Sequence, residues 1–82
     1  MILVDLTVTS VNNVYDFNLD ENTTIDLLIE EISELIEQKE QCVLAGDRKR
    51  LVLCDMRDRR ILPSNYTLYE CGIQTGDSLL LV

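Results

Sequence analysis

The hydrophobic period of this sequence changes abruptly near residue 24, and that change limits the folds open to the chain. In residues 2–9 and again in 14–19, apolar and polar residues alternate, which is the pattern of strands with one buried face. Polar, turn-forming residues lie between the two runs, so together they predict a β-hairpin. Beyond them, apolar residues recur at every third or fourth position, and this spacing predicts an amphipathic helix over about 24–39.

The predicted helix has a threonine at its start and two contrasting sides. Either Thr23 followed by Asp26, or Thr24 alone, is expected to cap its N-terminus. The apolar side consists of Ile25, Leu28, Ile29, Ile32, Leu35 and Ile36. The other side is acidic and consists of Asp26, Glu30, Glu31, Glu34 and Glu37.

The second half of the chain predicts three shorter strands. Residues 40–49 are irregular, with a turn at Ala45-Gly46-Asp47. Strands are expected at 50–54 and 60–62, joined by a charged tip and ended by Pro63, and a last strand at 78–82 after the turn Gly76-Asp77. Eighty-two residues hold one core, so residues 1–82 are expected to be a single domain. The fold class is α+β: a β-β-α-β-β-β mixed sheet with one crossing helix.

A single core between helix and sheet follows from these periods. Its expected members are Leu6, Phe17, Ile25, Leu28, Ile32, Leu51, Leu68, Ile73, Leu79 and Leu81.

Composition excludes several classes of partner. The net charge is −8, which repels phosphate backbones and anionic lipid surfaces, so nucleic acid is not expected as a partner. No run approaches the roughly 18–20 apolar residues that a membrane span needs, and direct membrane insertion is not expected. The N-terminus lacks the basic segment of a secretory signal peptide, so a cytoplasmic location is predicted.

The residues that carry chemistry are sparse. The chain has no histidine, and its Cys42, Cys54 and Cys71 are odd in number and irregularly spaced, unlike a disulfide framework or a zinc site. Reduced, mostly buried thiols are the favoured interpretation, with a reactive Cys71 as the alternative. No nucleophile lies beside a base, and the acidic residues lack the spacing of a calcium loop. The sequence predicts no catalytic residue, no cofactor and no metal; the protein is not expected to be an enzyme.

Charge is divided unevenly along the chain. Residues 1–40 hold ten acidic side chains and one basic, whereas residues 41–82 hold five acidic and six basic. The acidic helix face has two interpretations: a solvated surface, or a surface that attracts a partner. The basic residues Arg48, Lys49, Arg50, Arg57, Arg59 and Arg60 flank the short middle strands and could meet an acidic partner or the helix of a second copy.

Three apolar residues are expected on the outward side of the sheet. If Leu51 and Leu53 face the core, then Val52 faces outward. If Leu79 and Leu81 face the core, then Leu80 and Val82 face outward. Apolar residues gathered on a small charged domain indicate an interface. The candidate protein-binding site is therefore Val52, Leu80 and Val82, with Arg57, Arg59 and Arg60 at its rim.

Two stretches resemble ubiquitin. Thr24-Ile25-Asp26 opens the helix as ubiquitin's helix opens, and the residues from Thr67-Leu68 to Ile73-Gln74 resemble the turn before its last strand. The ending LYECGIQTGDSLLLV is most similar to the YukD/EsaB family of small bacterial ubiquitin-like proteins associated with type VII secretion. The resemblance implies a β-grasp (ubiquitin-like) fold over nearly the whole chain.

The resemblance also implies a function. A YukD-like protein would be a non-enzymatic accessory or adaptor of a type VII secretion system, and its partner would be the cytoplasmic part of a membrane component. The alternative is a ubiquitin-like scaffold in another assembly. Modifier and sulfur-carrier roles are not expected, because those proteins end in a flexible tail with two glycines and this sequence ends in Leu-Leu-Leu-Val.

Overall fold

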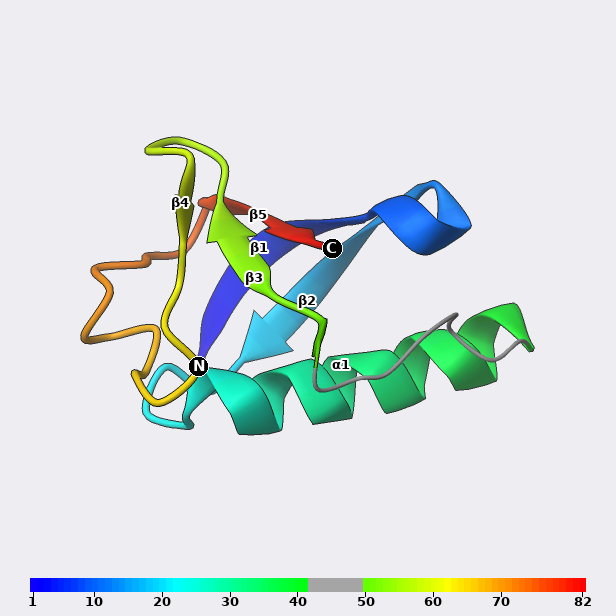
Figure 1. Cartoon of the computed structure of the whole chain (residues 1–82), viewed down its shortest axis with the longest axis horizontal. Helices are drawn as coiled ribbons and strands as arrows, with labels where there is room; N and C mark the ends of the chain where they lie inside the picture. Colours follow the sequence, from blue (N-terminus) through cyan, green and yellow to red (C-terminus); the bar gives the residue numbers. More distant parts are fainter. Residues whose placement is uncertain (42–49) are drawn as a thin grey trace.

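The computed structural model describes residues 1–41 and 50–82 and shows, among them, a five-stranded sheet crossed by one helix (Figure 1). The predicted order of strands and helix is confirmed. In chain order the elements are β1 (Ile2–Val8), the 3-10 turn η1 (Thr9–Val11), β2 (Asn13–Leu19), α1 (Ile25–Glu40), β3 (Leu53–Asp55), β4 (Arg60–Ile61) and β5 (Ser78–Leu81).

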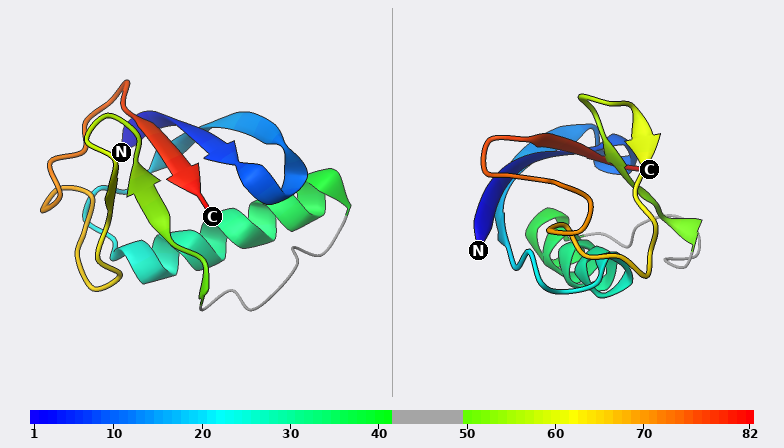
Figure 2. Two further views of the ribbon diagram at one scale, coloured as in Figure 1. Left: turned by 45° about the horizontal axis from the view of Figure 1, so that its top comes forward. Right: turned by 90° about the vertical axis from the view of Figure 1, so that its left-hand side faces the viewer.

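The first and last strands lie side by side within the sheet. The strand order is β2-β1-β5-β3-β4, with β1 and β5 parallel and the other neighbours antiparallel. In this register Leu6 lies opposite Leu79, and Val8 lies opposite Leu81. Figure 2 shows the sheet curving over α1, which lies against its concave side. We call the opposite, convex side the outer face.

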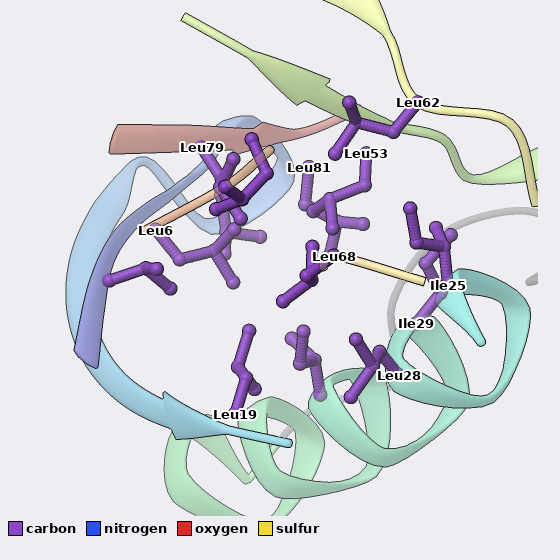
Figure 3. Close-up of a cluster of buried hydrophobic side chains, with 14 of the residues drawn as sticks. Leu6, Leu19, Ile25, Leu28, Ile29, Leu53, Leu62, Leu68, Leu79 and Leu81 are labelled. Atoms are coloured by element: carbon purple, nitrogen blue, oxygen red, sulfur yellow. The ribbon is translucent and has the colours of Figure 1, made fainter. Parts of the chain in front are cut away.

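The core fills the space between the sheet and α1 (Figure 3). Eight predicted members are buried: Leu6, Ile25, Leu28, Ile32, Leu68, Ile73, Leu79 and Leu81. The other two, Phe17 and Leu51, are only partly buried and pack against the cluster from its edges. Leu62, which was not predicted in the core, is also buried, and its N–H donates to the carbonyl of the core residue Leu53 (2.8 Å).

Backbone carbonyls hold the start of α1, where the sequence predicts a side-chain cap. Thr24 is the N-cap residue, but its side chain bonds no helix amide. The N–H groups of Ile25 and Asp26 instead donate to the carbonyls of Tyr66 (2.8 Å) and Ser64 (3.0 Å). The loop after β4 therefore satisfies two donors that every helix leaves open at its N-terminus.

Element boundaries differ slightly from the sequence prediction. The helix runs one residue later at each end, and Leu35, predicted on its apolar side, is 52% exposed because it lies at the margin of that side. The strand predicted at 50–54 is β3, Leu53–Asp55, and the one predicted at 60–62 is β4, Arg60–Ile61. The predicted turn Ala45-Gly46-Asp47 lies outside the described residues.

Glycine sets the turn before β5, as predicted. Gly76 has φ = +94°, a conformation that residues with a Cβ rarely adopt. Its N–H donates to the carbonyl of Leu3 (2.8 Å), and the N–H of Asp5 donates to the carbonyl of Asp77 (3.1 Å). The turn thereby delivers β5 alongside β1 in register.

The end of α1 is attached to the start of β2 by one carboxylate. Glu40 accepts hydrogen bonds from the Tyr15 hydroxyl and from the Asn13 side-chain amide (3.3 Å). These two donors, Tyr15 foremost, hold the pKa of Glu40 below its usual value.

The register of β5 predicts a large effect of one core truncation. Leu79→Ala is expected to cost roughly 2–5 kcal/mol in the free energy of unfolding, because the side chain is fully buried between β1 and α1. Leu3→Ala on the outer face is the control and should change it by less than about 0.5 kcal/mol. Chemical denaturation measures both, and similar costs would contradict the assigned faces.

Glu40 predicts a pH dependence of stability. Because its folded-state pKa is depressed, its contribution is present above the ordinary glutamate pKa of about 4.3 and is lost as the pH falls through the folded-state value. Glu40→Gln removes this titration. Between pH 6 and pH 3 the urea midpoint of the wild type should therefore fall further than that of the variant, and parallel falls would contradict the assignment.

Candidate protein-binding surface

The outer face of the sheet carries an apolar surface built by β3, β5 and the residues that flank them. Leu53 and Leu81 are buried against the core, so their neighbours in sequence turn outward. Cys54 pairs with Leu80 in the register of β3 and β5, and both side chains are partly exposed. One step beyond, Val52 and Val82 exchange two backbone hydrogen bonds of 2.8 and 3.1 Å.

We define the Leu80 surface as Val52, Cys54, Met56, Leu80 and Val82, with Arg59 at its edge. Four of these residues (Cys54, Met56, Arg59 and Leu80), together with Asp55, line an open hollow of about 390 Å³. Met56 is 45% exposed and Val82 is 42% exposed, so apolar area is available to a partner. Ile61 extends the surface onto β4, because it pairs with Cys54 and is 65% exposed.

The structure brings together the three apolar residues that the sequence singled out. That this surface binds a protein stays a prediction. The sequence reasoning missed Cys54 and Met56, which it did not assign to the outer face. Strand alternation could have found Cys54, because a residue that follows inward-facing Leu53 must face outward. Met56 begins the charged tip, and Ile61 lies in the predicted strand at 60–62, which is too short for alternation to assign its faces.

Arg60, predicted at the rim, also has an internal role. Its Nε lies 3.7 Å from Oδ2 of Asp55, which is only 1% exposed, and its Nη2 donates to the carbonyl of Cys71. That Asp55 oxygen has no hydrogen-bond partner among the described residues. The guanidinium is therefore the compensating charge for a buried carboxylate and joins β4 to the loop before β5.

Arg57 is similarly engaged. Its Nη2 lies 3.6 Å from Asp77 Oδ1, and its backbone N–H donates to Asp55 Oδ1 (3.0 Å). Its side chain is 65% exposed, so this ion pair contributes little to stability. It does anchor the β3–β4 turn to the turn before β5.

Arg59 differs from its two neighbours. Within the described part of the chain its guanidinium forms no hydrogen bond or ion pair, and it lines the hollow beside Leu80. Its backbone lies in the left-handed region, with φ = +54°, at the end of the turn that precedes β4. Of the three predicted rim arginines, Arg59 is thus the one whose charge is available to a partner. Arg48 and Lys49, two other basic residues of the prediction, lie outside the described residues.

The cysteines differ in burial. Cys71 is 6% exposed and burial raises the pKa of its thiol, which makes it a poor nucleophile. This favours packing over the reactive alternative for Cys71. Cys54 is a free thiol on the Leu80 surface, and Cys42 lies outside the described residues. Over residues 1–41 and 50–82, no group of three or more acidic, cysteine or histidine side chains is arranged to hold a metal ion.

The helix of the described residues does not qualify as a membrane span. Across the described ranges, no helix is both long and apolar enough to traverse a bilayer.

Comparison with solved structures defines the class of protein. The chain matches the N-terminal ubiquitin-like domain in the 4931431F19Rik protein with a TM-score of 0.75 and 23% identity, over 99% of this chain and 72% of that one. It matches Caldiarchaeum subterraneum ubiquitin with a TM-score of 0.72 and 14% identity, over 98% and 89% of the two chains. The fold is therefore the ubiquitin-like β-grasp that the sequence predicted.

The family follows from a family model that matches nearly the whole chain. Residues 3–81 match the family described as "WXG100 protein secretion system (Wss), protein YukD". The protein belongs to the YukD family, as its C-terminal residues had indicated.

Two secretion-system structures share the fold. The EccD5 ubiquitin-like domain from Mycobacterium xenopi matches with a TM-score of 0.78 and 23% identity, over 99% of this chain and 91% of that one. A chain of the MycP5-free ESX-5 inner membrane complex matches with a TM-score of 0.81 and 19% identity, over 99% of this chain and 20% of that one. No curated protein sequence matches the chain.

The different roles of two adjacent arginines give a testable prediction. Arg60→Gln should lower the free energy of unfolding by roughly 1–3 kcal/mol, because it leaves the buried Asp55 carboxylate without a counter-charge. Arg59→Gln is the matched control and should lie within about 0.5 kcal/mol of the wild type. Urea denaturation measures both, and equal effects would show that Arg60 does not compensate Asp55.

Proposed function

We propose that this YukD-family protein is a non-enzymatic accessory subunit of a WXG100 (type VII) secretion system and that it binds its partner through the Leu80 surface. The observation that carries the proposal is the hollow beside Leu80, which adjoins exposed apolar residues and Arg59, an arginine whose guanidinium has no partner among the described residues. Seventeen apolar side chains of the described residues are buried in the core, and those of the Leu80 surface lie outside it. Apolar residues gathered outside it therefore need a reason, and a partner supplies one.

The chemistry of the surface defines the partner. An apolar side chain fits the hollow formed by Cys54, Met56 and Leu80, and a carboxylate next to it would pair with Arg59. Burial of the apolar centre would set the dissociation rate, and the arginine would accelerate association with an acidic surface. Arg57 and Arg60 support this role by holding the turn that positions Arg59.

The family, and the secretion-system structures that share the fold, support a place of action at the membrane. The solved ESX-5 chain belongs to an inner membrane complex, and the chain described here spans a fifth of its length. We propose that residues 1–82 form one cytoplasmic domain, recruited to the membrane by the cytoplasmic part of a secretion-machine component. In this role the protein positions other proteins and catalyses no reaction.

A pair of charge substitutions tests the surface. Leu80→Asp places a carboxylate in the apolar hollow and should abolish co-purification of secretion components from cells that carry the system. Tyr69→Asp is the control, since Tyr69 is 74% exposed and lies in the loop before β5, outside the Leu80 surface. Far-UV circular dichroism and thermal melting establish that both variants are folded. Recovery of the same components with folded Leu80→Asp as with wild type would refute this site.

A further inference from the structure

The free edge of β2 is a second feature that the Leu80 surface does not use. The two edges of the sheet differ: β4 has only two residues, and Pro63, which has no N–H, follows shortly after it. Such an edge offers little to a new strand. β2 has seven residues, Asn13–Leu19, and among the described strands it pairs only with β1.

The register shows which backbone groups of β2 point outward from the sheet edge. In β1 the N–H of Asp5 donates to the carbonyl of Asp77, and the carbonyl of Leu3 accepts from the N–H of Gly76. Both partners lie in the turn that leads into β5. The odd-numbered residues of β1 thus bond toward β5, and the even-numbered ones bond toward β2. Asp5 lies opposite Asp16 and Leu3 lies opposite Asn18.

Consequently Asp16 and Asn18 direct their backbone N–H and C=O groups away from β1, to the open edge. The same holds for Val14, whose N–H is satisfied by the side chain of Asn13 (2.9 Å). The N–H groups of Asp16 and Asn18 have no partner among the described residues. Two donors spaced for an incoming strand are therefore available.

An apolar groove lies beside this edge, on the side of the helix. It has a volume of about 340 Å³ and is lined by Phe17, Leu35, Ile36, Gln38 and Lys39. Leu35 is 52% exposed there, and Phe17 is only partly buried. The Lys39 ammonium lies over the Tyr15 ring, 5.4 Å from its centroid, so the basic residue among the described lining residues already has an aromatic partner.

Two carboxylates, Asp5 and Asp16, lie opposite each other on the outer face near this edge. The contact with Asp16 raises the pKa of Asp5. Like charges opposite one another destabilise a sheet. A cation placed next to Asp16 would relieve that repulsion.

We propose that the β2 edge binds an extended segment of a partner protein in which apolar and basic residues alternate, added as an antiparallel strand. Its basic side chains lie on the outer face beside Asp16, and its apolar side chains lie in the groove on Phe17 and Leu35. Backbone hydrogen bonds to Asp16 and Asn18 supply affinity, and the two side-chain rows supply specificity. A second copy of this chain is disfavoured as the occupant, because β2 against β2 would bring further carboxylates to Asp16.

The probe is an end-blocked heptapeptide of alternating valine and lysine, added to the isotopically labelled full chain. Amide NMR signals of β2 are expected to shift, and hydrogen exchange at Asp16 and Asn18 is expected to slow. N-methylation of the lysine residues, whose backbone faces β2 in this pairing, should abolish binding. N-methylation of the valine residues, whose backbone faces solvent, should preserve it. Equal binding of the lysine-methylated and parent peptides would overturn the proposal.

Charge is tested separately. Asp16→Asn should weaken binding of the lysine peptide by up to about fivefold, whereas Asp58→Asn in the β3–β4 turn should leave it unchanged. A peptide with glutamate in place of lysine should not bind wild type. Tight binding of the glutamate peptide would overturn the proposed partner chemistry. Concentration-dependent shifts of the Asp16 and Asn18 signals without any peptide would identify a second copy as the occupant and would also overturn it.

Discussion

The parallel pairing of β1 with β5 is the constraint on which the other features depend. It places Leu6 beside Leu79 and Val8 beside Leu81, so the two ends of the described chain close one core over α1. Because strand side chains alternate, the same register turns Leu80 to the opposite side. A shift of one residue would bury Leu80 and expose its neighbours, and the core and the Leu80 surface would be lost together.

The charged residues of the β3–β4 turn serve two purposes that the structure separates. Arg57 and Arg60 contact Asp77 and Asp55 and thereby fix the turn against the rest of the domain. Arg59, held between them in a left-handed conformation, lies beside the apolar hollow. Binding through one arginine on a held turn costs less conformational entropy than binding through three mobile arginine side chains would.

Much of the fold could be predicted because the spacing of apolar residues along the sequence indicates which side chains are buried. Element order, the core face of each long segment and the turn at Gly76 were confirmed. The buried carboxylate of Asp55 was not foreseen, because its partner Arg60 is adjacent only through the pairing of β3 with β4. The helix start was assigned to a side chain for the same reason, since its carbonyl partners at Ser64 and Tyr66 are distant in sequence. The three apolar site residues could be placed together, but the engagement of each arginine is a tertiary property.

The central claim, that the Leu80 surface contacts a secretion component, is tested most directly by site-specific photo-crosslinking in cells that carry the system. A photoreactive amino acid such as benzoylphenylalanine is introduced at position 80 or, as the reference, at position 69 in the loop before β5. The account predicts a discrete cross-linked product between position 80 and a component of the secretion machine, and none from position 69. Cross-linking from position 69 alone, with none from position 80 in a folded protein, would contradict it.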